Sequence, residues 1–172
     1  MHLAVDIYTY LVNARASNEA VIFIIGMLPI AELRGAIPIG ILLLKENTLT
    51  TVIWAYLGNV APVPLLLFLF QPVSRSLSRF SLFRIFFKWL FDRTTKRAHH
   101  VERFGALGLM LFVAVPLPVT GAWTGCIAAT LFRIRFRYAC IAICLGVAMA
   151  AAVVTLLVIS GRLGAALLAA NN

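Results

Sequence analysis

The chain has 172 residues, of which 62% are hydrophobic and 12% are charged. This composition is far more apolar than that of an ordinary soluble domain, and it indicates an integral membrane protein. The formal net charge of +9 does not indicate nucleic-acid binding, because the basic residues interrupt or flank apolar segments; anionic lipid headgroups are the expected partners. No low-complexity linker divides the chain, so a single membrane domain over 1–172 is expected.

The first segment, 1–19, lacks the basic leader and long apolar core of a signal peptide. Its length and mixed polarity predict a short helix that lies at the membrane surface. Ser17 or Asn18 is placed to cap the helix that follows, since both side chains can accept a hydrogen bond from a free backbone N–H.

An apolar run over 20–44 is long enough to cross a bilayer, but its interior is wrong for a plain span. Pro29 and Pro38 each remove a backbone donor, and Gly35 between them loosens the backbone. These residues predict a re-entrant hairpin whose two half-helices meet near 32–35. Irregular backbone at that depth is tolerated only when it is buried in protein or faces a water-filled cavity, so the tip is expected to line a wet space.

Glu32 and Arg34 lie at this predicted tip. A charge at the centre of a bilayer costs about 2.5 to 3.5 kcal/mol on insertion scales, so the two side chains need each other, other polar partners or water. Ionisable residues inside a membrane are functional candidates by default. The alternative is a structural clamp that closes the turn or caps the second half-helix.

The first complete span is predicted over 49–70. Asn59 near its middle is expected to face inward, where it either contacts substrate or joins this span to a neighbouring helix. The connector, 71–103, alternates basic with aromatic and aliphatic residues. It is therefore predicted to be an amphipathic helix at the headgroup boundary.

A second broken apolar run over 105–132 mirrors the first, and its interior reads AVPLPVTGAWTG. The hydroxyl groups of Thr120 and Thr124, with exposed backbone N–H groups, are suited to holding an anion, and Trp123 is expected to pack the cavity. A purely structural turn is the alternative. The second complete span is predicted over 138–159, followed by a tail over 160–172.

The order of segments is hairpin and span (20–70), connector, then hairpin and span (104–159), which is an internal repeat. Eleven of the fifteen Lys and Arg residues lie in the connector and in the FRIRFR segment at 132–137. By the positive-inside rule the connector is cytoplasmic and both termini are on the outer side, so the two hairpins enter from opposite faces. Inverted repeats with broken helices at the midplane are a recurrent transporter architecture. The predicted fold class is an all-α integral membrane protein built from such a repeat.

Three motifs occur together: ELRGAIP at 32–38, LGN at 57–59 and PLPVTGAWTG at 116–125. In this combination, over nearly the whole chain, the sequence resembles the small multi-drug export protein family. More distantly, the two opposed hairpins look like those of the DedA and VTT superfamily, whose members are implicated in moving phospholipids or polyprenyl phosphate carriers. That superfamily places arginines in the second hairpin, where this chain has none, so Arg34 is expected to supply the positive charge instead.

The pattern and the resemblance together predict a transporter of the bacterial inner membrane. The leading hypothesis is translocation of an anionic lipid headgroup: Arg34, Thr120 and Thr124 would hold the phosphate, and Glu32 would accept a coupling proton. Seven residues are expected to form turns or hinges at the tips: Pro29, Gly35, Pro38, Pro116, Pro118, Gly121 and Gly125. One alternative is export of small cationic amphiphiles with Glu32 as the binding carboxylate. The other is a structural or assembly protein.

No paired carboxylates, metal ligands or Ser-His set adjoin either tip, so an enzyme activity, a cofactor and a metal site are not expected. Two complete spans would leave the hairpins poorly shielded from lipid. A homodimer or a larger homo-oligomer is therefore expected.

Overall fold

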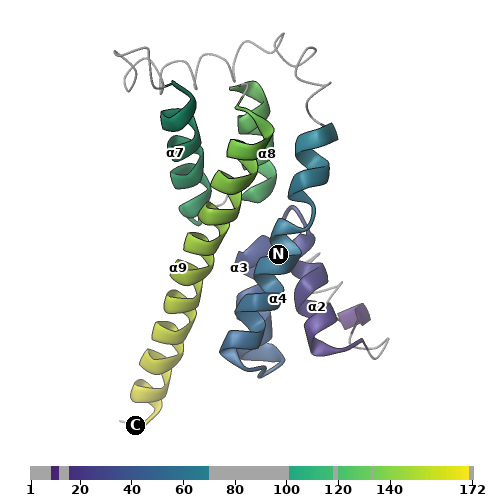
Figure 1. Cartoon of the computed structure of the whole chain (residues 1–172). Helices are drawn as coiled ribbons and strands as arrows, with labels where there is room; N and C mark the ends of the chain where they lie inside the picture. The colour runs from purple at the N-terminus through teal and green to yellow at the C-terminus, as the bar shows by residue number, and fades with distance from the viewer. Residues whose placement is uncertain (1–8, 12–15, 70–100, 118–119, 133, 171–172) are drawn as a thin grey trace.

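The structure is a computed structural model that describes residues 9–11, 16–69, 101–117, 120–132 and 134–170. All regular secondary structure within these ranges is helical, as the sequence predicts (Figure 1). The elements in chain order are α2 (Asn18–Met27), α3 (Glu32–Pro38), the π-helix η1 (Ile39–Leu43), α4 (Thr48–Val60), α7 (Val101–Ala114), α8 (Ala122–Leu131) and α9 (Phe136–Ala170). Most of the predicted surface segment at 1–19 and of the connector at 71–103 lies outside the described residues.

Two helical segments are long and apolar enough to cross a bilayer, Thr48–Leu69 and Phe136–Leu163. They correspond to the spans predicted at 49–70 and 138–159. The first is interrupted by a turn at 61–62, where Pro62 cannot donate a backbone hydrogen bond. The second is longer than predicted, because α9 continues without a break to Ala170. The expected tail is thus largely helical, as its Ala- and Leu-rich sequence, which contains no proline, allows.

Helices α2 and α3 form the first hairpin, and its turn lies at 28–31 and not at the predicted 32–35. Pro29 explains the difference, since a residue that precedes proline is driven out of the helical conformation. Leu28 is accordingly extended, with φ −70° and ψ 134°, and it ends α2. At the other end of α2, Ser17 is the N-cap, as expected, because its Oγ accepts from the Ala20 N–H at 3.3 Å.

Gly35 and Pro38 lie inside α3 and not in the turn, contrary to the sequence-based prediction. The glycine allows a close approach, since a Cβ there would lie 2.9 Å from the Ala31 Cβ. Pro38 is the last residue of α3, and the π-helix follows it directly. A proline cannot supply the N–H that a continuing α-helix requires, so it marks the point where the helical pattern changes.

Helices α7 and α8 form the second hairpin, with a connection over 115–121 that contains Pro116 and Gly121. Pro118 lies outside the described residues. Gly125, predicted to belong to the turn, lies in α8. A Cβ at this position would approach the Val113 Cγ2 to 2.6 Å, so this glycine permits α7 and α8 to pack closely.

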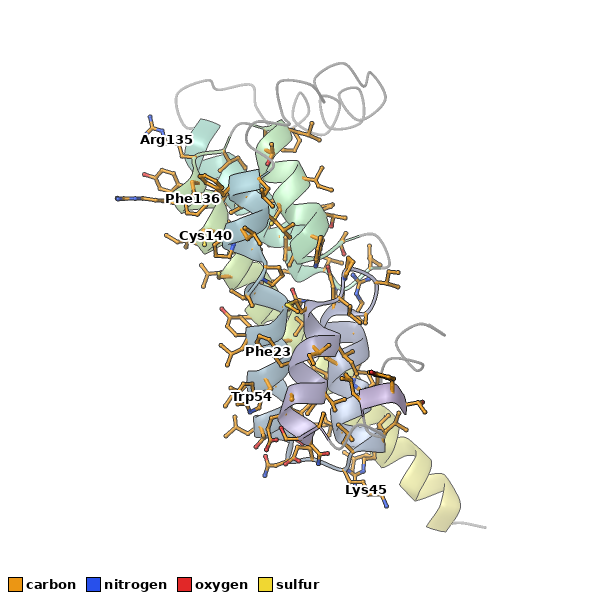
Figure 2. The ribbon with its side chains drawn as sticks, turned by 90° about the vertical axis from the view of Figure 1, so that its right-hand side faces the viewer. Phe23, Lys45, Trp54, Arg135, Phe136 and Cys140 are labelled. Atoms are coloured by element: carbon orange, nitrogen blue, oxygen red, sulfur yellow. The ribbon has the colours of Figure 1, made fainter. Side chains whose placement is uncertain are left out.

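The two hairpins lie in opposite halves of the molecule and point their turns at one another (Figure 1). Helix α2 packs against α4 and α7 packs against α9, while the long α9 passes both hairpins and also contacts α3. Lys45 and Arg135 lie at opposite ends of the molecule, and Phe23 and Trp54 lie close together between α2 and α4 (Figure 2). Their ring centroids are 6.3 Å apart in an edge-to-face arrangement.

A polar network joins the two ends of the first hairpin, on the side away from its turn. The Asn18 Nδ2 donates to the Glu46 Oε2 at 3.0 Å, and the Asn47 N–H donates to the Glu46 Oε1 at 3.2 Å. These hydrogen bonds, chiefly the one from Asn18, lower the pKa of Glu46 below its ordinary value. The Asn47 side chain also caps α4 by accepting from the Leu49 N–H at 2.8 Å. The start of α2 is thereby tied to the start of α4.

Gly58→Ala should destabilise the protein, because the added Cβ would lie 2.1 Å from the Phe23 carbonyl oxygen on α2. That atom belongs to a helix backbone and cannot rotate away, so overpacking should cost about 1–3 kcal/mol. Gly108→Ala is the matched control, since its Cβ would meet nothing within 4 Å. Unfolding in mixed detergent micelles, followed by circular dichroism, measures both. Equal stability of the two variants would contradict the close approach of α2 and α4.

Candidate functional site

The turns of the two hairpins are joined directly through Arg34. Its guanidinium, carried by α3, donates hydrogen bonds to the backbone carbonyls of Leu117 and Thr120 in the connection between α7 and α8. A reciprocal bond runs from the second hairpin to the first, since the Trp123 Nε1 donates to the Met27 carbonyl at 3.2 Å. The tips of the two broken apolar runs therefore meet.

Glu32 is the buried partner of this junction, with 5% of the residue exposed. Its Oε2 lies 3.3 Å from the Nη2 of Arg34, so the two side chains form an ion pair, which is one of the alternatives that the sequence leaves open. Its Oε1 accepts from the backbone N–H of Trp123 at 3.4 Å. Trp123 is the second residue of α8, and the N-cap of that helix, Gly121, has no side chain to satisfy the free N–H groups.

The Glu32 carboxylate therefore caps a helix of the opposite hairpin. An N-terminus carries unpaired N–H donors and the positive end of the helix dipole, so a carboxylate is stabilised there. From the sequence, the structural role expected of Glu32 lies within its own hairpin, as a clamp on the turn or a cap on the second half-helix. The partner across the molecule is a main-chain group, and main-chain donors leave no signal in a sequence.

Two backbone conformations make this contact possible. Glu32 has φ +46°, a region in which a non-glycine residue costs about 1–3 kcal/mol. Gly121 has φ +155°, a conformation essentially restricted to glycine. A Cβ on Gly121 would lie 1.9 Å from the Glu32 Oε2, so the carboxylate occupies space that any other residue would fill.

The hydroxyl groups predicted to hold an anion are engaged within the second hairpin. The Thr120 Oγ1 donates to the Val115 carbonyl and accepts from the Leu117 N–H at 3.0 Å. The Thr124 Oγ1 donates to the Gly121 carbonyl at 3.3 Å. Thr120 thus reaches Arg34 through its carbonyl oxygen and not through its hydroxyl group.

A small cavity of about 10 Å³ lies beside the ion pair. It brings together four of the predicted site residues, and its polar lining comprises Glu32, Arg34, Asn59, Thr120 and the backbone of Gly121. Apolar residues of α7 and α9 close the remaining walls. Trp123 is joined to the same site by its hydrogen bonds, whereas Thr124 does not line the cavity.

The chemistry of the junction is that of a cation held by oxygen acceptors. A guanidinium presents five N–H donors, and here two carbonyls and one carboxylate receive hydrogen bonds from it. Within the described residues, no group of three or more His, Cys, Asp and Glu side chains is arranged to hold a metal ion.

An integral membrane protein is indicated by two features of the structure. Two apolar helices have spanning length, and a charge pair lies where two interrupted helical hairpins meet. The model of the family described as Putative small multi-drug export protein matches residues 32–153, and the chain belongs to this family. The matched region begins at Glu32 and contains both sides of the junction. Neither the comparison with curated proteins nor that with solved structures found a match.

Gly121→Ala should disrupt the junction, because it combines an unfavourable backbone conformation with a clash against Glu32. We expect a loss of about 2 kcal/mol or more of unfolding free energy. Gly105→Ala is the control, since its Cβ would meet Ile134 at an ordinary 3.8 Å.

A double-mutant cycle separates the two causes of this loss. In a Glu32→Ala background the clash disappears, so the additional cost of Gly121→Ala should fall. An unchanged cost would show that the carboxylate does not occupy the space beside Gly121.

Proposed function

We propose that this protein is a membrane exporter in which two re-entrant hairpins, inserted from opposite faces, meet at mid-bilayer. The observation that carries the proposal is the junction itself: Arg34 of one hairpin is bound to the Leu117 and Thr120 carbonyls of the other. Interrupted helices that meet at the centre of an inverted repeat are a recurrent transporter design. In this arrangement the junction closes the pathway, and it must open for a substrate to pass.

The proposed orientation follows from the distribution of positive charge. Arg135 and Lys45 lie at opposite ends of the molecule (Figure 2). Arg137 follows Arg135 at this end, and α7, which begins there, comes directly after the basic sequence at 71–100 (Figure 1). We place this end in the cytoplasm of a bacterial inner membrane, with Lys45 and the C-terminal end of α9 outside.

Single cysteines introduced into a cysteine-free background test this orientation. Lys45→Cys and Arg162→Cys should react with a membrane-impermeant maleimide added to intact cells. Arg137→Cys should react only after the cells are opened. Labelling of Arg137→Cys and Lys45→Cys from the same side would rule out the proposed arrangement.

Among substrates, the junction favours a small organic cation. The acceptors of Leu117, Thr120 and Glu32 converge on a guanidinium, so a cationic substrate would take the place that Arg34 occupies. The family description, small multi-drug export, agrees with this class of activity. Glu32 would then be the binding carboxylate, as in the alternative considered from the sequence.

Translocation of an anionic lipid headgroup is the second candidate, and one observation favours it. The Arg34 side chain is 28% exposed and that of Glu32 only 7%, so the positive member of the pair is the more accessible. Against this, Thr120 and Thr124 use their hydroxyl groups inside the hairpin, and the α8 N-terminus already holds a carboxylate. An anion would have to displace Glu32 before it could reach those N–H groups.

Ethidium efflux from cells, and movement of a fluorescent phosphatidylglycerol across liposomes, distinguish the two substrates. For a cation exporter, Glu32→Gln should abolish ethidium efflux, because it removes the one carboxylate that the described residues place at the junction. Arg34→Ala should keep or increase it, since the competing guanidinium is gone. For an anion carrier, Arg34→Ala should abolish movement of the lipid.

Glu19→Gln and Arg162→Gln are matched controls, because they make the same charge changes on α2 and α9 outside the junction. Both should behave as wild type. If Glu32→Gln and Arg34→Ala lower only the stability or the yield of the protein, and wild type moves neither probe, the structural or assembly hypothesis replaces transport.

A further inference from the structure

Asn59 of α4 has an oxygen atom that nothing in the described part of the chain satisfies. The residue is 1% exposed, and its Oδ1 has no hydrogen-bond partner among those residues. A buried amide oxygen left in this state costs about 1–3 kcal/mol. Buried polar groups in proteins are bonded to protein or to ordered water, so a donor is missing at this position.

The missing donor would lie in the cavity beside the ion pair, because Asn59 lines this cavity together with Glu32, Arg34 and Thr120. With a volume of about 10 Å³, this cavity is at the size needed to hold one water molecule. A buried water requires two to four polar partners, and this lining supplies them. Thr51, whose Oγ1 is also buried without a partner, belongs to the same helix but does not line the cavity.

We propose that the cavity holds one water molecule that bridges the Asn59 Oδ1 and the Glu32 carboxyl group, and that this bridged carboxyl is the proton-binding site of the protein. When Glu32 is ionised, the water donates one hydrogen to the carboxylate and the other to Asn59. When a proton from solution binds the carboxylate, the new O–H donates to the water, and the bond to Asn59 is kept. No other bond is formed or broken, except that the ion pair with Arg34 is lost.

The charges around Glu32 favour a proton over a metal cation. Arg34 lines the same cavity, and a second cation beside its guanidinium would be repelled. On α8, the Trp123 N–H donates to Glu32, and the titratable side chain is the thiol of Cys126. On α4 it is the Tyr56 hydroxyl, which donates to the backbone carbonyl of Cys144 on α9 at 3.4 Å. The titratable side chains of α9 are Arg137, Tyr138, Cys140, Cys144 and Arg162, and none of them lines the cavity. In the described side chains of α7 there is no titratable group, and Glu19 lies at the far end of α2.

Protonation would weaken the junction in a defined way. A neutral Glu32 no longer attracts the guanidinium as an ion, while the bonds from Arg34 to Leu117 and Thr120 remain. The ion pair lies within the first hairpin, whereas the bond that Glu32 accepts from the Trp123 N–H joins the two hairpins and loses its ionic character on protonation, so this tie responds to protons. This use of the site in transport rests on the proposed function, whereas the water and the protonation do not.

Infrared difference spectra between acid and neutral pH test the site on purified full-length protein in lipid nanodiscs, without any transported substrate. In the wild type, a carboxylic acid band should appear on acidification, together with a water O–H band that shifts in H₂¹⁸O. Glu32→Gln should remove the water band and the part of the carboxylic acid band that Glu32 contributes, while the five other Asp and Glu residues keep their contributions. Asn59→Leu should remove the water band, and Thr51→Val, the matched control on α4, should retain both.

A second variant removes the water without touching a polar group. Ala150 lines the cavity from α9, so Ala150→Leu should fill the space and abolish the H₂¹⁸O-sensitive band. With the water gone, the carboxylate loses a hydrogen bond, and the midpoint pH of the carboxylic acid band should rise by about one unit or more.

The site is refuted if the wild type gives no H₂¹⁸O-sensitive band, or if that band survives in folded Asn59→Leu or Ala150→Leu protein. A carboxylic acid band of the same size in Glu32→Gln and in wild type would assign the proton to another residue. Because these readouts need no substrate, a failure of ethidium efflux overturns the exporter proposal alone.

Discussion

The arrangement of both hairpins depends on one carboxylate that caps a helix of the opposite hairpin. Glu32 begins α3, yet its Oε1 binds the N-terminus of α8, which has only a glycine as its N-cap. The strained φ of Glu32, the glycine at position 121 and the ion pair with Arg34 are all requirements of that contact. A helix N-terminus carries unpaired N–H donors and the positive end of the helix dipole, and the fold supplies an anion there from the first hairpin.

The junction is also balanced in charge, since a carboxylate and a guanidinium neutralise each other where the hairpins meet. Each ion is further held by main-chain groups of the second hairpin: an N–H for Glu32 and two carbonyls for Arg34. The exposed peptide groups of an interrupted helix, which lipid cannot satisfy, are in this way paired with ions. The breaks in the apolar runs leave main-chain groups unpaired, and the charged side chains within the same runs pair with those groups.

The sequence predicts the elements of this fold better than the contacts between them. Pro29, the long apolar runs and Ser17 are local signals, and they correctly predict a break in the first apolar run, two long apolar helices and an N-cap. Gly35 and Pro38 resemble helix breakers in the sequence, but here the glycine serves close packing and the proline ends a helical turn, so the turn lies earlier than expected. The ion pair is one of three ways, with other polar partners or water, in which two charges inside an apolar run can be satisfied, and the sequence does not choose among them. The carbonyls of Met27, Leu117 and Thr120 were not predictable, since any residue provides a carbonyl.

The two long segments differ mechanically, although they occupy corresponding places in the two halves of the chain. Helix α9 is continuous from Phe136 to Ala170 and packs against both hairpins, so it behaves as a stiff rod. The Thr48–Leu69 segment has a turn at 61–62, where proline removes a main-chain bond. A motion that parts the hairpins would bend this segment and leave α9 straight. In the proposed export cycle the protein would therefore open as a hinge at the turn at 61–62, and the first hairpin together with α4 would be the moving arm.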